Sequence, residues 1–101
     1  MDDQGIQRTP GWSHDALVYL IEEVQAKAIG HEILNTDAGL TVAESGDKLP
    51  EEYYLLLKDI YQIEVLNNLD QVPASGALIT IAFPHFSQAA SSPVRAIAIL
   101  P

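Results

Sequence analysis

Apolar side chains recur at helical spacing in two separate stretches of the chain. Residues 14–25 carry apolar side chains three or four positions apart, and Ser13 before them is a good helix cap. A second helix is expected from Pro50, because proline suits the first turn and two glutamates follow it. The pattern therefore predicts two amphipathic helices that each bury one face. The apolar positions of these faces are Leu17, Leu20, Ile21 and Val24, and then Tyr53, Tyr54, Leu56, Leu57 and Ile60.

Four other stretches are typical of strands. Residues 26–30 form a short apolar run, and residues 61–65 alternate apolar side chains with Gln62 and Glu64. Residues 77–83 and 94–100 are apolar at nearly every position, which favours strands that are covered on both faces. The order helix, strand, helix, strand, strand, strand predicts an α/β fold. Since two helices can cover only one face, the pattern indicates that the chain forms half of a larger structure.

Composition narrows the class of protein. The 101 residues amount to one domain, and five Lys and Arg against fourteen Asp and Glu give a net charge of −9. This charge, without a basic stripe, argues against nucleic-acid binding. The chain has no cysteine, an acidic start unlike a signal peptide, and no apolar run long enough for a membrane helix. We therefore expect a cytoplasmic protein in which residues 1–11 are a flexible lead-in.

Chemistry is expected first in the loop that follows the 26–30 strand. His31, Glu32 and Asp37 lie within seven positions of it and could bind a metal or move protons, or the loop could merely cap the following turn. Glu64 is a carboxylate in the middle of a predicted strand, so it lies on a wet face or is held by a partner charge or a metal. Arg95 in the last strand could pair with Glu64, reach a substrate carboxylate or face water, and a structural ion pair is the default.

Other side chains suggest simpler roles. His14 and His85 are expected at the surface, and Trp12 either staples the first helix or lines a pocket. No nucleophile-elbow pattern surrounds a serine, and no glycine-rich phosphate loop occurs. Serine-type catalysis and nucleotide binding are therefore disfavoured.

Three segments resemble the cyclase family of kynurenine-formamidase-like metal-dependent hydrolases. They are Lys27–Gly30 with acids at Glu32 and Asp37, the strand 60–70, and the closing stretch 92–98, which reads SPVRAIA. The resemblance implies a swivelling β/β/α fold of which residues 12–101 form the C-terminal half, with two helices and about four strands. It also implies arylformamidase- or cyclase-like hydrolysis of an amide or lactam C–N bond, with Zn²⁺ or Mn²⁺ as cofactor.

The resemblance also implies roles for individual residues. Glu64 matches a metal-binding carboxylate of the family, and Glu52 stands where many members carry a histidine, so it could act as a ligand or a base. On this hypothesis His31, Glu32 and Glu52 are catalytic, and Asp37 and Arg95 bind substrate. The His-x-x-x-His-x-Asp metal motif of the family is absent from the sequence. The chain is thus expected to bind little or no metal alone and to be inactive without the N-terminal half, or without a second copy of the chain.

A second hypothesis makes the chain a non-catalytic remnant. The apolar strands would then serve a dimerising or binding module, because exposed apolar surface of that size rarely stays open. A third hypothesis, an unrelated small acidic α/β domain, is disfavoured by the three matched segments.

Overall fold

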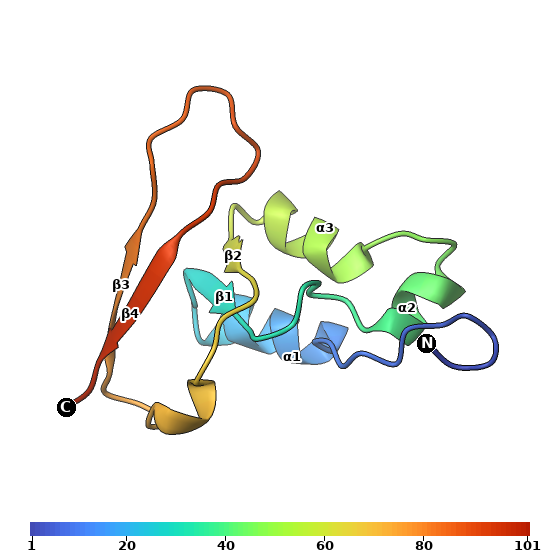
Figure 1. Ribbon diagram of the computed structural model, residues 1–101, viewed down its shortest axis with the longest axis horizontal. Helices are drawn as coiled ribbons and strands as arrows, with labels where there is room; N and C mark the ends of the chain where they lie inside the picture. Colours follow the sequence, from blue (N-terminus) through green and yellow to red (C-terminus); the bar gives the residue numbers. More distant parts are fainter. The chain divides into compact units, whose positions relative to one another are not determined.

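The computed structural model describes the whole chain, Met1–Pro101, as a small mixed α/β protein, which confirms the predicted class. It forms two compact units, unit 1 (Met1–Asn67) and unit 2 (Asn68–Pro101). Figure 1 labels the α-helices and the strands. Unit 1 contains α1 (His14–Val18), the π-helix η1 (Tyr19–Glu23), β1 (Ala28–Gly30), α2 (Gly39–Glu44), α3 (Pro50–Leu57) and β2 (Tyr61–Ile63). Unit 2 contains the short 3₁₀-helix η2 (Leu69–Gln71), β3 (Leu78–Ala82) and β4 (Arg95–Ile99).

The first predicted helix is confirmed from residue 14 to residue 23. The hydroxyl of Ser13 accepts a hydrogen bond from the backbone N–H of Ala16 at 3.3 Å and so caps α1. The helix then widens into η1, where the backbone N–H of Val24 donates to the carbonyl of Tyr19 five residues earlier. One continuous helical segment therefore carries Leu17, Leu20 and Ile21 of the predicted apolar face, whereas Val24 follows the helix and is 53% exposed.

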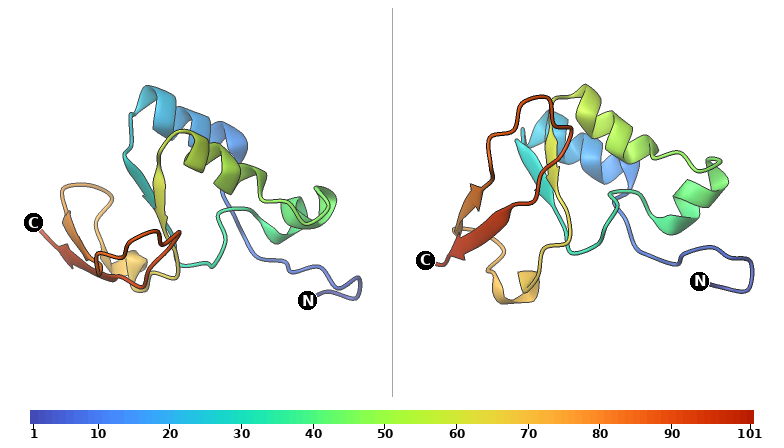
Figure 2. Two further views of the ribbon diagram at one scale, coloured as in Figure 1. Left: turned by 90° about the horizontal axis from the view of Figure 1, so that it is seen from above. Right: turned by 45° about the horizontal axis from the view of Figure 1, so that its top comes forward.

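The core of unit 1 lies between the helices and a parallel pair of strands. Strands β1 and β2 pair with Ile29 opposite Gln62. Ile29 joins Leu17 of α1, Leu55 of α3 and Ile60 in the buried cluster, so both helices cover the same face of the pair. Figure 2 shows α1 and α3 lying side by side next to β1 and β2. This small cluster is the main source of apolar stabilisation in unit 1.

Unit 2 is built on a single antiparallel pair of strands. β3 and β4 pair from Leu78 opposite Ile99 to Ala82 opposite Arg95, as the two apolar stretches predicted. Leu78 and Ile79 are neighbours in a strand, so their side chains point to opposite faces of the pair. They are 69% and 55% exposed, so both faces carry exposed apolar side chains. Because unit 2 contains no α-helix of its own, it cannot cover either face of this pair. None of the helices in the chain has the length and apolar composition of a membrane-spanning segment.

The structure corrects three local predictions. It leaves Tyr53, Leu56 and Leu57, which were expected on the buried face of the second helix, exposed, because α3 turns Leu55 and Glu51 inward instead. It adds α2, which the sequence pattern did not indicate and whose N-cap residue, Ala38, makes no side-chain capping bond. It also ends the predicted 61–65 strand at Ile63, so Glu64 follows β2 and does not lie in its middle. The cause is Val65, whose φ of +56° is incompatible with a continued strand.

The left-handed backbone at Val65 leads to a stability prediction. A β-branched residue is strained there, while asparagine tolerates the same φ and Val65 is 64% exposed, so little packing is lost. We expect Val65→Asn to raise the free energy of unfolding by about 1 kcal/mol. Urea denaturation measures this change. The control Val24→Asn, at a half-exposed valine with φ of −80°, should bring no gain, and equal effects at both sites would contradict the explanation.

Candidate functional site

Asp37 links the loop after β1 to the start of α3. Its side chain is almost fully buried, and its two carboxylate oxygens accept hydrogen bonds from the backbone N–H groups of Glu51 at 2.9 Å and Glu52 at 3.0 Å. These N–H groups have no partner within the helix, and a negative charge is favoured at a helix N-terminus. Asp37 is thus a capping carboxylate supplied from 14 residues upstream, and it fixes the position of the first turn of α3.

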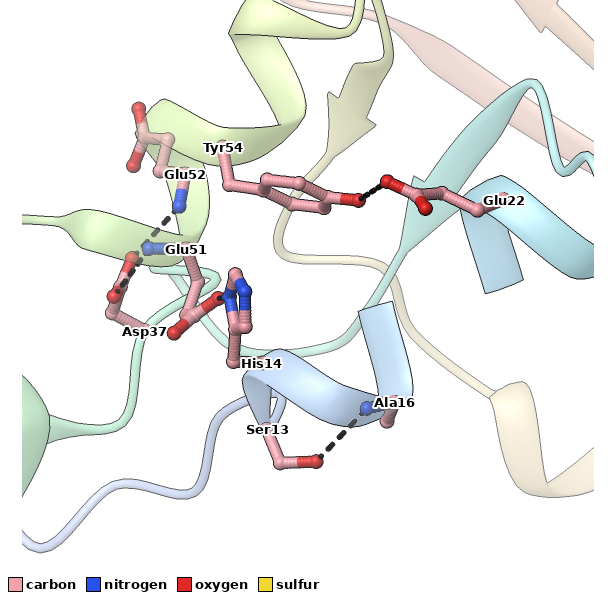
Figure 3. A network of polar contacts seen from close by, with 8 residues as sticks. All are labelled: Ser13, His14, Ala16, Glu22, Asp37, Glu51, Glu52 and Tyr54. Carbon is pink, nitrogen blue, oxygen red and sulfur yellow. Dashed lines mark hydrogen bonds and ion pairs between the residues drawn. The ribbon is translucent and has the colours of Figure 1, made fainter. Parts of the chain in front are cut away.

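A second set of polar contacts joins α1 and η1 to α3. Figure 3 shows His14 of α1 beside the side chain of Glu51, with Nδ1 of His14 2.8 Å from Oε2 of Glu51. The His14 ring also meets the ring of Tyr54 edge to face, and the hydroxyl of Tyr54 donates to Glu22 at 3.1 Å. His14 is exposed as predicted, but the structure gives it a role in holding α1 against α3.

Glu52 and Glu64 are two nearby carboxyl groups whose pKa values are both raised. Partial burial raises the pKa of Glu52 above its ordinary value of 4.5, and the charges of Glu64 and then Asp37 raise it further. Partial burial likewise raises the pKa of Glu64. Because the charge of Glu64 acts on Glu52, the first turn of α3 and the end of β2 bring these two side chains within electrostatic range of each other. The sequence predicted both residues as parts of a site, 12 positions apart, and the structure places them near each other.

The backbone just after β2 is held against the loop that follows β1. The N–H of Val65 donates to the carbonyl of Ile33, and the N–H of Leu66 donates to the carbonyl of His31. These two hydrogen bonds fix the backbone of Val65 and Leu66, directly after Glu64. Glu64 therefore extends from a constrained segment and not from a free loop.

The raised pKa values give a pH-dependent prediction. A carboxyl group whose folded pKa lies above its unfolded value stabilises the fold below the unfolded pKa, and this contribution is lost as pH rises through the folded pKa. Glu64→Gln removes one such group and also lowers the pKa of Glu52, so we expect the stability of unit 1 at pH 7 to rise relative to that at pH 4. Denaturation at the two pH values measures the difference. Glu44→Gln, at an exposed position of α2, is the control and should leave the difference unchanged.

His31 is buried next to Trp12. The indole Nε1–H of Trp12 donates to Nδ1 of His31 at 3.2 Å, and His31 is only 7% exposed. Burial lowers the pKa of the His31 imidazole, which favours its neutral form. The sequence singled out His31 but not this pairing, because the two residues are 19 positions apart and only the fold brings them together.

The remaining predicted residues are more dispersed. Glu32 is exposed, and Arg95 belongs to unit 2, so its predicted pairing with Glu64 or with a substrate stays a prediction. The loop trio is divided in the structure, because Asp37 caps α3 while His31 contacts Trp12. No group of three or more His, Asp or Glu residues is arranged to hold a metal ion. The chain by itself thus offers a carboxylate pair and a buried imidazole, without a complete ligand set.

Comparison with known proteins identifies one informative similarity. The chain is 31% identical over 102 aligned positions to isatin hydrolase from Roseibium aggregatum, and the alignment covers 98% of this chain. It spans only 37% of the length of that enzyme. No protein-family model matches the chain, and no solved structure matches it. The chain is therefore similar to a part of a hydrolase along nearly all of its own sequence.

Proposed function

We propose that the chain is a portion, corresponding to the C-terminal half, of a metal-dependent hydrolase that opens an amide or lactam C–N bond. The observation that carries the proposal is the proximity of Glu52 to Glu64, whose charge raises the pKa of Glu52, in a chain similar to isatin hydrolase over 98% of its length. Isatin is itself a cyclic amide, and its ring opens when water adds to the amide carbonyl and the C–N bond breaks. A swivelling β/β/α fold, completed by other strands, belongs to the same proposal.

The carboxylate pair fits a divalent cation as part of a shared centre. A nearby cation would stabilise the charged forms of two carboxyl groups whose pKa values are raised, and oxygen ligands suit Mn²⁺ and also Zn²⁺. Two ligands do not complete the coordination of either ion, so the others come from outside the chain. When bound, such an ion polarises a carbonyl and activates water, which makes a cysteine or serine nucleophile unnecessary.

The other residues of the chain support this pair. Asp37 holds the first turn of α3 through the amides of Glu51 and Glu52, and so positions Glu52. The polar contact between Nδ1 of His14 and Oε2 of Glu51 braces the same turn against α1. We propose His31 and Glu32 as further catalytic groups and Arg95 as a substrate-binding group, as the sequence predicted.

The partner in this proposal is a chain that supplies the remaining part of the hydrolase. The present chain spans 37% of isatin hydrolase, and the β3–β4 pair leaves apolar side chains of both faces more than half exposed. Strands with two apolar faces are stable when other elements cover them. We propose that the partner carries the His-x-x-x-His-x-Asp motif and covers these strands in a cytoplasmic complex.

Complementation tests the proposed function. The chain is mixed with the part of isatin hydrolase that lies outside the aligned region, and opening of isatin is followed with Mn²⁺, with Zn²⁺ and with a chelator. We expect metal-dependent hydrolysis by the mixture and none by either part alone. A stable complex without hydrolysis under any metal would overturn the catalytic proposal. If the chain instead self-associates and does not bind the partner, its apolar strands form the interface of a dimerising module.

A further inference from the structure

The hydrogen bond between Trp12 and His31 determines which nitrogen of the imidazole carries the proton. An indole N–H can only donate, so Nδ1 of His31, at 3.2 Å, must be the acceptor. In a neutral imidazole the proton then lies on Nε2. Trp12 is itself fixed, because its backbone N–H donates to the carbonyl of Thr36 at 2.9 Å and its ring packs against the core cluster.

The opposite nitrogen of the same ring is buried without a partner. Nε2 of His31 has no hydrogen-bond partner and is screened from solvent. The backbone of His31 is held on both sides, since its N–H donates to Ile63 and its carbonyl accepts from Leu66. A buried donor without an acceptor is rare in folded proteins and costs about 1–3 kcal/mol. Such a donor points to an acceptor that this chain does not provide.

We propose that Trp12 is a positioning residue that holds His31 as the Nε2–H tautomer, so that His31 donates a hydrogen bond to a substrate carbonyl oxygen and does not act as a base. The identity of the acceptor rests on the proposed function, whereas the tautomer does not. A general base needs a free lone pair, and the one on Nδ1 is already occupied by Trp12. A neutral donor in a chain of net charge −9 favours a carbonyl over a carboxylate. Because Nε2 is shielded from water, a hydrogen bond formed there meets no competition from solvent.

Nitrogen-15 NMR of the full-length chain tests the tautomer directly. Long-range ¹H–¹⁵N correlations distinguish the two neutral forms, and His14→Gln and His85→Gln assign the signals of the three histidines. We expect His31 to be neutral at pH 7.5 with its proton on Nε2, and to show a coupling across the hydrogen bond to the indole nitrogen of Trp12. A proton on Nδ1, or a doubly protonated ring, would overturn the inference without any variant being made.

Trp12→Phe keeps an aromatic ring and removes the donor. The ratio of the Nε2–H form to the Nδ1–H form of His31 should fall about tenfold, as expected for the loss of about 1.4 kcal/mol. Tyr54→Phe is the matched control, since it removes a hydrogen bond to Glu22 from another aromatic side chain and should leave the ratio unchanged. An unchanged ratio in folded Trp12→Phe would show that Trp12 does not set the tautomer. If that variant does not fold, the wild-type coupling decides.

The donor role is tested in the complemented enzyme. Glutamine at position 31 offers an N–H donor but no base, whereas leucine offers neither. We expect His31→Leu to reduce kcat at least tenfold more than His31→Gln does. Equal losses would contradict a donor role. If neither the complemented wild type nor the two variants hydrolyse isatin, the proposed function fails, while the NMR result still decides the tautomer.

Discussion

Asp37→Ala is expected to destabilise unit 1 by about 3 kcal/mol, which lowers the ratio of folded to unfolded chain by roughly a hundredfold. Both carboxylate oxygens of Asp37 accept hydrogen bonds from backbone N–H groups at the start of α3, and the side chain is only 1% exposed. Removing it leaves two N–H groups without partners and takes away a charge that favours the helix N-terminus. Since α3 carries the core residue Leu55, loosening its first turn also weakens the core.

Fluorescence in urea measures the loss at Asp37. Trp12 is the sole tryptophan and lies in unit 1, so its emission reports on that unit. Asp37→Asn should fall between the alanine variant and wild type, because an amide retains one acceptor oxygen but turns its N–H₂ toward a donor. Asp3→Asn, at an exposed aspartate, is the control and should change little. A loss below 1 kcal/mol in Asp37→Ala would show that the cap is not needed.

Glu64→Gln is expected to reduce isatin hydrolysis by the complemented enzyme at least about a hundredfold. Replacing even a residue that only supports a metal ligand costs about 10–100-fold, so loss of a ligand should cost no less. The loss would not reflect unfolding, because removal of a carboxyl group with a raised pKa stabilises the fold at neutral pH. A lower rate in Glu64→Gln would therefore report the loss of the Glu64 carboxylate itself.

Steady-state kinetics with saturating and limiting metal separates the two causes of a lower rate at Glu64. If Glu64→Gln only weakens metal binding, activity should partly return at high Mn²⁺. If the substitution removes a catalytic group, activity should stay low at every Mn²⁺ concentration. The control is again Glu44→Gln, at an exposed position of α2, which should behave as wild type. Full activity in Glu64→Gln would exclude this residue from the metal centre.

Local patterns predicted most of the secondary structure. Helical spacing identified the 14–23 helix, and proline followed by two glutamates identified α3. The apolar runs around β3 and β4 were also sufficient, since each strand contains a single polar residue, Thr80 in β3 and Arg95 in β4. The helix α2 was missed because it is only six residues long and begins without a side-chain cap. The strand at β2 was extended too far because periodicity gives no sign of a left-handed backbone at Val65.

The site was harder to predict from the sequence than the secondary structure, because its contacts join residues that are far apart in the chain. Asp37 could be recognised as a polar loop residue, but not as the cap of a helix that begins 13 positions later. The coupling of Glu52 with Glu64 depends on how α3 leads into β2, and the pairing of Trp12 with His31 depends on the loop after β1. Residue type and spacing identify candidates, but tertiary contacts decide which of them meet.

Paramagnetic broadening by Mn²⁺ tests the central claim most directly, since Glu52 and Glu64 are held to offer one cation site. Mn²⁺ is titrated into the ¹⁵N-labelled full chain, and the loss of each amide signal is followed. Broadening should be strongest at the first turn of α3 and at the residues after β2, and Glu64→Gln should remove this preference. Equal broadening near all fourteen acidic residues, unchanged in Glu64→Gln, would contradict the account.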